Sequence, residues 1–221
     1  MTSYGLKTNV REKATCWLVL LSVIISYLLY NLIDLIVQNN YSALKPFLDG
    51  IKKIEYLGII SIHCSALTIY GLIKLIYNKL IWKAPIIRCW HKVPNLNGKW
   101  TGELTSSYQG KKMIFSVNIK QSWNKILVHC IFDHSESISD CVTIKTEGNS
   151  TWIIYTYENE IKENTHGSVP HKGVMELRMM PDSQLVGDYY TQRNPSTHGH
   201  VRLMRQDGSC ERNLCTTQRN D

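Results

Sequence analysis

The chain has 221 residues, enough for one sizeable domain and a smaller accessory region. Its formal net charge of +7 suits anionic partners such as phosphates, nucleic acid or lipid headgroups, although a solvated basic surface would have the same composition. The chain has seven cysteines, an odd number, and no Cys-x-x-Cys pair, which is the pattern of neither a zinc site nor a disulfide framework.

Two hydrophobic segments, residues 16–37 and 56–77, lie in the first third of the chain. Each has about the 20-residue length that crosses the hydrocarbon core of a bilayer. The first run is too long for the apolar region of a signal peptide and no small-residue cleavage site follows it, so we expect two retained transmembrane helices within a membrane region over residues 1–80. Small residues in the second segment would allow close helix packing within or between chains: Gly58, Ser61, Ser65 and Gly71.

Cations flank the two hydrophobic segments on their outer sides, whereas the connector between them carries lysines balanced by acids. By the positive-inside rule this asymmetry predicts a multi-pass protein with both termini in the cytoplasm. Residues 81–97 contain Trp82 and Trp90 among basic residues and two prolines, which is typical of an interfacial linker between membrane and domain.

Beyond this linker, residues 98–207 read as an all-β domain, followed by a polar tail over residues 208–221. Eight runs alternate in polarity and are rich in β-branched and aromatic residues. They cover residues 99–107, 112–121, 125–133, 137–146, 151–159, 173–180, 184–193 and 199–205. Eight consecutive strands with short links predict an eight-stranded, up-and-down antiparallel β-barrel of the lipocalin-like kind, with a two-sheet sandwich as the alternative.

The predicted connections differ between the two ends of this barrel. Residues 122–125, 147–150 and 181–183 are tight turns that lie at the end where the first strand begins. Four links lie at the opposite end, and two of them, residues 160–172 and 194–198, are long and rich in Gly, Pro and His. Because ligands enter small barrels at such an open end, we expect a mouth there, facing away from the membrane.

Alternation assigns the faces of the strands, and the predicted interior becomes more polar toward the mouth. Trp100 and Leu104 belong to an apolar floor, whereas the mouth carries hydroxyl, phenol, amide and guanidinium groups. The candidate ligand-binding residues are Ser106, Ser107, Tyr108, Tyr189, Thr191, Arg193 and Asn194. Arg193 can donate two parallel hydrogen bonds to a phosphate, and the tyrosines can stack on a base, but an ordinary solvated rim would have the same composition.

Other chemistry has little support in the sequence. His198 and His200 share a strand face but lack a third metal ligand, and we expect no metal or other cofactor. Neither an acid pair nor a nucleophile, metalloprotease or phosphate-loop motif is present, so an enzyme is not expected.

Two segments carry a resemblance to a known family. The domain opens with Gly98-Lys-Trp-Thr-Gly-Glu-Leu-Thr-Ser-Ser-Tyr108 and closes with a segment that contains Tyr-Tyr-Thr-Gln-Arg193-Asn. Together with the membrane region they make the chain, up to about residue 205, similar to the SMODS-associated two-transmembrane, β-strand-rich effectors of bacterial CBASS anti-phage systems, the STING-like β-barrel proteins associated with a CD-NTase.

This resemblance implies that the barrel binds a cyclic dinucleotide made by a cognate CD-NTase after phage infection. It further implies self-association of the transmembrane segments, disruption of the inner membrane and death of the infected cell, without direct binding of DNA or RNA. The sequence alone leaves two alternatives open: a membrane-anchored, lipocalin-like carrier of an apolar molecule, and a structural barrel that docks a partner protein.

Overall fold

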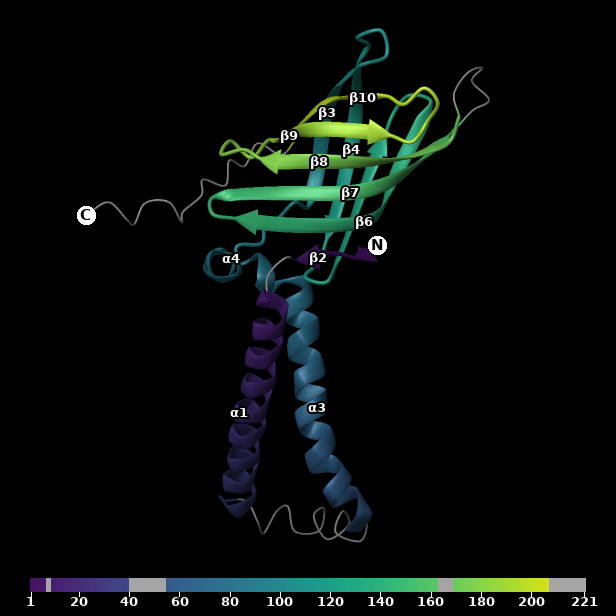
Figure 1. Cartoon of the computed structure of the whole chain (residues 1–221). Coiled ribbons are helices and arrows are strands. Elements are labelled where there is room, and N and C mark those ends of the chain that lie inside the picture. The colour runs from purple at the N-terminus through teal and green to yellow at the C-terminus, as the bar shows by residue number, and fades with distance from the viewer. Residues whose placement is uncertain (7–8, 40–54, 163–168, 207–221) are drawn as a thin grey trace, which may run out of the picture. The chain divides into compact units, whose positions relative to one another are not determined.

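The structure is a computed structural model that describes residues 1–6, 9–39, 55–162 and 169–206. Within the two long helices, the side chains of residues 33–34, 36–38 and 55–65 are outside this description. The chain forms two compact units (Figure 1). One is Asn9–Ile81, and the other combines Met1–Thr8 with the chain from Trp82 onward.

The helical unit contains α1 (Val10–Asn39) and α3 (Glu55–Lys79), which contact each other. Within the described residues, only Val10–Leu32 is long and apolar enough to cross a membrane, with a mean hydropathy of 1.9 and 6% of that stretch buried. The second predicted segment does form a helix, but the structure shows one candidate span rather than two, and the second crossing stays a prediction. Among the proposed helix contacts, the side chains of Gly58, Ser61 and Ser65 lie outside the described residues.

The second unit is built on a closed barrel of eight antiparallel strands, as the sequence predicts. Each strand pairs with the next along the chain, and the last pairs with the first, which excludes an open sandwich. In Figure 1 the strands β6, β7 and β8 cross β3 and β4 at a steep angle, as opposite walls of a small barrel do. The strands are β3 (Gly98–Ser106), β4 (Lys112–Gln121), β5 (Lys125–Ile131), β6 (Ser135–Glu147), β7 (Ser150–Ile161), β8 (His171–Met179), β9 (Leu185–Thr191) and β10 (His198–Arg205).

Alternate side chains of the barrel strands point inward, with one interruption in β6, and the predicted apolar floor at Trp100 and Leu104 is confirmed. Trp100, Leu104, Leu185 and Leu203 are buried in the apolar core. Inside β6 a register shift between Ser139 and Cys141 inserts a residue and changes which positions face inward.

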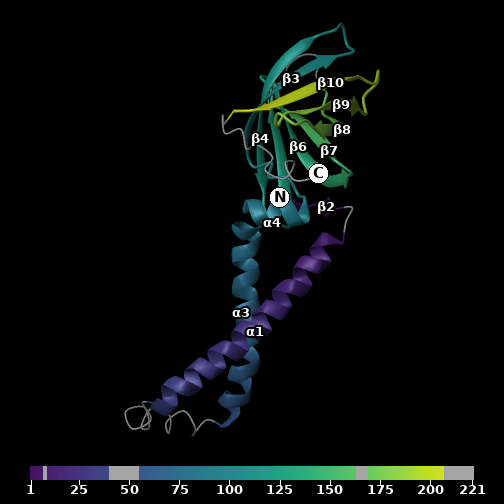
Figure 2. The ribbon, with the colours of Figure 1, turned by 90° about the vertical axis from the view of Figure 1, so that its left-hand side faces the viewer.

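The N-terminal residues belong to the barrel wall, which the sequence does not indicate. Strands β5 and β6 pair only through His129–Ile131 and Glu136–Ile138, and beyond these residues they separate. Strand β1 (Thr2–Ser3) pairs antiparallel with β5, while β2 (Gly5–Leu6) pairs parallel with β6. Tyr4 between them is buried, so this segment fills the split between β5 and β6. Figure 2 shows β2 and the N-terminus at the end of the barrel that carries α4.

The segment before β3 covers the end of the barrel that carries the tight turns. It contains a 3₁₀ turn, η1 (Ile81–Lys83), and a short helix, α4 (Pro85–His91). Trp82 is completely buried here, so the expectation that it anchors at a membrane interface is wrong; it packs instead against the rings of His91 and Trp123. Gln121 then fixes the following residues through its side chain, which accepts a hydrogen bond from the Leu96 N–H and donates one to the Pro94 carbonyl.

Candidate ligand-binding site at the loop end of the barrel

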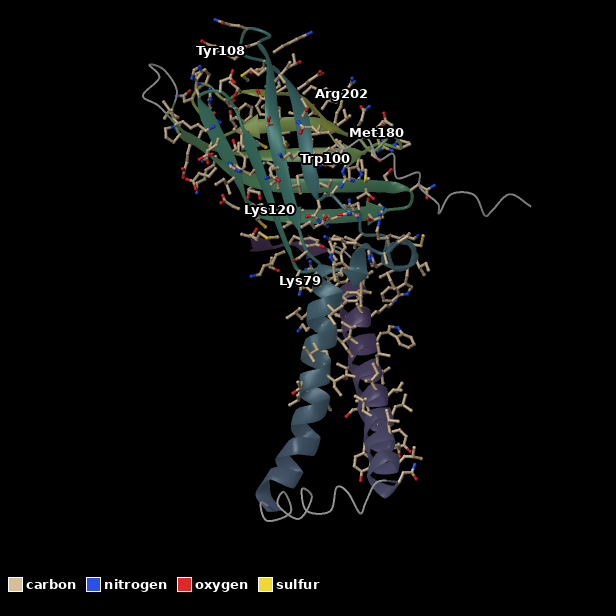
Figure 3. All side chains as sticks on the ribbon, turned by 180° about the vertical axis from the view of Figure 1, so that it is seen from behind. Lys79, Trp100, Tyr108, Lys120, Met180 and Arg202 are labelled. Carbon is tan, nitrogen blue, oxygen red and sulfur yellow. The ribbon has the colours of Figure 1, made fainter. Side chains whose placement is uncertain are left out.

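The loop end of the barrel is the end formed by the β3–β4, β5–β6, β7–β8 and β9–β10 connections. It lies opposite the closed end, which carries α4 and the tight turns. Figure 3 shows Tyr108, in the β3–β4 connection, at the loop end and Lys120, near the end of β4, toward the closed end. The core is apolar over most of the barrel, but the inward-facing side chains near the loop end are polar or aromatic. They are Ser106, Ser137, Ser139, Tyr157, Asn159, Tyr189 and Thr191.

Aromatic rings in this interior lie against glycines on neighbouring strands. Tyr157 pairs with Gly173, and a Cβ built on Gly173 would come within 2.4 Å of the Tyr157 phenol. Likewise, Tyr189 pairs with Gly199, where a Cβ would lie 2.7 Å from the Tyr189 ring. Each glycine thus provides the space in which a phenol packs flat on the barrel wall.

Ser106 connects two walls of the barrel. Its hydroxyl oxygen accepts a hydrogen bond of 2.9 Å from the buried Tyr189 hydroxyl and one of 3.1 Å from the Tyr108 N–H. The first bond joins β9 to β3 across β10, and the second holds the start of the β3–β4 loop. Two of the predicted site residues, Ser106 and Tyr189, therefore form one hydrogen-bonded pair.

A second polar cluster lines the β6–β7 wall. The Asn159 side-chain amide donates to the Ser137 hydroxyl at 2.8 Å and to the Ser135 hydroxyl at 3.2 Å. Deeper in the barrel, the Tyr155 hydroxyl donates to the Met175 sulfur at 2.9 Å and lies 3.8 Å from the Cys130 sulfur. Burial raises the pKa of Cys130 to about 12, so this thiol is protonated at neutral pH and is unreactive.

Arg193 provides positive charge at the loop end. Its charge acts on both Tyr157 and His171. Burial raises the pKa of Tyr157, and the positive charge of Arg193 opposes that rise. Burial lowers the pKa of His171, and the positive charge of Arg193 lowers it further. The rings of Tyr157 and His171 are packed edge to face, with their centroids 6.5 Å apart. Within the described part of the chain, the Arg193 guanidinium has no hydrogen bond or ion pair.

The structure places the seven predicted site residues in three different settings. Ser106, Tyr189 and Thr191 are buried in the interior, and Arg193 lies beyond the end of β9 near Tyr157 and His171. Thr191 is engaged in the β9–β10 loop, where its hydroxyl oxygen accepts the Thr197 N–H at 2.9 Å. The other three are exposed on the β3–β4 and β9–β10 loops: Ser107, Tyr108 and Asn194.

Sequence reasoning missed Ser137, Ser139, Tyr157 and Asn159 as part of this interior, and the partly exposed His171 beside it. For β7 a signal existed, because its inward face runs from Ile153 through Tyr157 to Asn159 and becomes polar toward the same end as β9 does. For β6 simple alternation fails, because the register shift after Ser139 separates its polar inward positions from its apolar ones.

The two histidines of β10 do not form a metal site with their neighbours. The His200 ring nitrogen Nδ1 lies 3.0 Å from Asp188 on the adjacent strand, in an exposed pair. The described residues contain no group of three His, Cys, Asp or Glu side chains that could hold a metal ion.

Fold and site together define a small antiparallel barrel with an apolar closed end and an aromatic, polar and cationic loop end, and it is at such ends that small barrels with ligands hold them. Among known families, the sequence model of the Cap15 cyclic dinucleotide receptor domain matches residues 91–205, just over half of the 221-residue chain. This chain therefore belongs to that family.

Two curated relatives point the same way. A CD-NTase-associated protein 15 from Yersinia aleksiciae is 27% identical over 133 residues, which is 58% of this chain and 64% of the relative. A protein of the same name from Staphylococcus schleiferi is 27% identical over 150 residues, or 66% of this chain and 80% of that one. The resemblance to CD-NTase-associated effectors that the sequence indicates is thereby confirmed, although the match spans under two thirds of the Yersinia relative.

Proposed function

We propose that this chain is a membrane-anchored receptor whose barrel binds a cyclic dinucleotide at its loop end. The observation that carries the proposal is Arg193, a cation without an ion pair to any described residue, near the buried ring of Tyr157. Membership of a family of cyclic dinucleotide receptor domains supports the same ligand class. The chain is proposed to act as a receptor and not as an enzyme.

The chemistry of the loop end matches both parts of such a ligand. Arg193 can donate two parallel, charge-assisted hydrogen bonds to a phosphate. Tyr157 and Tyr189, which are buried in the absence of ligand, can stack on a base that enters the interior. The Asn159 amide and the Ser137 hydroxyl can hydrogen-bond to base edges, at the cost of part of the cluster they form with each other.

The binding step is tested by calorimetric titration of the full chain, reconstituted in lipid nanodiscs, with a panel of cyclic dinucleotides. We expect Arg193→Ala to weaken binding about 10- to 100-fold, the usual range for a hydrogen bond to a charged group. Arg202→Ala is the matched control, because Arg202 is an exposed arginine on the outer face of β10. Equal binding by a folded Arg193→Ala variant would remove Arg193 from the site, and a panel without any binder would overturn the ligand class.

We further propose that ligand binding drives self-association of the helical units and that this damages the bacterial inner membrane, with both termini in the cytoplasm. A ligand can shift the equilibrium between separate and associated chains only by the difference in its affinity for these two states. If the ligand links several barrels, weak contacts between their helices become multivalent and therefore more effective. The test is dye release from vesicles that contain the full chain, with and without the ligand that the titration identifies. Ligand-dependent release that Arg193→Ala abolishes is expected; binding without release would limit the protein to the receptor step.

The source of the ligand is proposed to be a CD-NTase that is active during phage infection. The name of the two relatives, CD-NTase-associated protein 15, supports this link. Co-expression of the chain with a CD-NTase encoded beside it should arrest growth, whereas a variant of that enzyme with an inactivated catalytic centre should not.

A further inference from the structure

Helix α4, only seven residues long, has two different sides. One side packs on the closed end of the barrel: His91 is buried, its ring centroid lies 4.9 Å from that of Trp123, and its Nε2–H donates to the Trp82 carbonyl at 2.9 Å. The other side carries Ile86 and Trp90, which are 82% and 49% exposed. Since residues four apart share a helix face, these two apolar side chains form one exposed patch on a helix that the barrel holds firmly.

The surroundings of this patch are basic. Residues 80–102 contain Lys83, Arg88, Lys92 and Lys99 but no aspartate or glutamate. In the part of the chain that the structure describes, none of the three lysines is paired with a carboxylate. Lys83 and Lys92, which flank α4 in the sequence, therefore have no carboxylate partner among these residues, although Lys83 Nζ lies 5.9 Å from the centroid of the Trp82 ring.

We propose that the α4 patch, Ile86 and Trp90 with Lys83 and Lys92, is a lipid-binding surface that lies on anionic headgroups. Trp and Ile beside Lys are the side chains that settle at the boundary between headgroups and acyl chains. Two apolar side chains are also too small an area for a stable protein interface, which buries about 800 Å² on each partner. The patch would bring the closed end of the barrel to the lipid surface and leave the loop end in solvent.

This inference rests on the membrane attachment proposed above, because residues 80–84 alone separate α3 from α4 along the chain. It goes beyond that attachment, since transmembrane helices could hold the barrel through a free linker. The experiment therefore needs separate reporters for the helix and for α4. Trp17 in α1 is 65% exposed and reports insertion of that helix, and Trp90 reports α4.

The full chain is reconstituted in nanodiscs of phosphatidylcholine alone or mixed equally with phosphatidylglycerol, each with and without lipid brominated near the headgroup. The fluorescence of Trp17 or Trp90 alone is obtained by subtracting the fluorescence of the Trp17→Phe or Trp90→Phe variant from that of the native chain, and its quenching is the loss on adding brominated lipid. We expect brominated lipid to quench Trp90 about twofold in the anionic discs and less in the neutral discs. Lys83→Gln combined with Lys92→Gln should reduce the quenching in anionic discs to the neutral level.

The matched control is Tyr190→Trp in the Trp90→Phe background, which places an exposed tryptophan on the outer face of β9 near the loop end and should not be quenched. Quenching of Trp17 without quenching of Trp90 would overturn the inference while the attachment stands. Equal quenching of Trp90 in both kinds of disc would overturn the role of anionic headgroups. If Trp90 is shielded from water only when several chains share a disc, the patch contacts a second copy of the chain and not lipid. Absence of quenching at Trp17 would overturn the attachment and this inference together.

Discussion

Gly173 leaves the space that the Tyr157 ring occupies. A methyl group there would lie 2.4 Å from the phenol and 2.6 Å from the Tyr190 carbonyl oxygen, so the ring or the strand has to move. We expect Gly173→Ala to destabilise the barrel by about 1–3 kcal/mol, the range for overpacking, and to weaken ligand binding by displacing Tyr157. Urea unfolding and calorimetric titration measure the two effects.

Val174→Ala on the same strand is the control for Gly173→Ala, because Val174 is partly exposed on the outer face of β8. Adding Tyr157→Leu should recover part of the stability lost in Gly173→Ala, since residues in contact are energetically coupled. A stability loss unaffected by the second substitution would place the strain at the Tyr190 carbonyl instead.

His91 makes the stability of the closed end depend on pH. Its Nδ1 accepts the Val93 N–H and its Nε2–H donates to the Trp82 carbonyl, so the ring is neutral, and burial lowers its pKa. In the unfolded chain the pKa of a histidine is about 6.5, so below that pH the unfolded state binds a proton at this ring that the folded state does not bind. The contribution of His91 is therefore complete above about pH 6.5 and declines as the pH falls below it, by up to about 1.4 kcal/mol per pH unit.

His91→Gln should consequently be less stable than the native chain at pH 7.5, and the difference between the two should shrink between pH 6.5 and pH 5. Urea unfolding followed by tryptophan fluorescence at each pH gives these free energies. Because the pKa of His171 is lowered as well, only the difference between the two chains isolates His91. A constant difference across this pH range would show that the His91 ring contributes packing alone.

At the scale of the element, β1 and β2 give the N-terminal segment a role in the barrel wall. Tyr4 is buried in the split between β5 and β6, and the Thr2 hydroxyl donates to the Ile126 carbonyl. We expect Tyr4→Ala to cost about 3–5 kcal/mol, as for a buried aromatic ring, and to speed amide exchange in β5 at residues 125–128. Tyr190→Ala, on an exposed ring, is the control, and unchanged exchange in β5 would exclude the wall role.

The elements differ in how well the sequence predicts them. The eight barrel strands have period-2 alternation and short turns, both of which are local signals, and each is found within a few residues of its predicted bounds. Strands β1 and β2 are two residues long and gain their partners from positions more than 100 residues away, so no local pattern marks them. Trp82 shows the same limit of local patterns. A tryptophan among cations is typical of a membrane interface, but in the folded chain Trp82 packs against Trp123, which lies 41 residues away in the sequence.

At the scale of the whole molecule, the two compact units should unfold as two events and not as one two-state transition. A ligand bound at the loop end stabilises only the barrel unit, by about 2.7 kcal/mol at a concentration of 100 times its Kd. Calorimetric scans of the reconstituted chain should therefore show one transition that the ligand raises and another that it leaves in place. A shift of both transitions would indicate that the helical unit also responds to the ligand.

The split between β5 and β6 also fixes an order of events during synthesis. Thr2 and Ile126 are separated by 124 residues, so β1 cannot pair with β5 until both helices and the first two barrel strands have been made. Pairings over such distances form late, because the entropy of closing the loop is lost before any contact repays it. Until then the edges of β5 and β6 at the split lack these partners, and unpaired strand edges can pair with an extended strand of another chain.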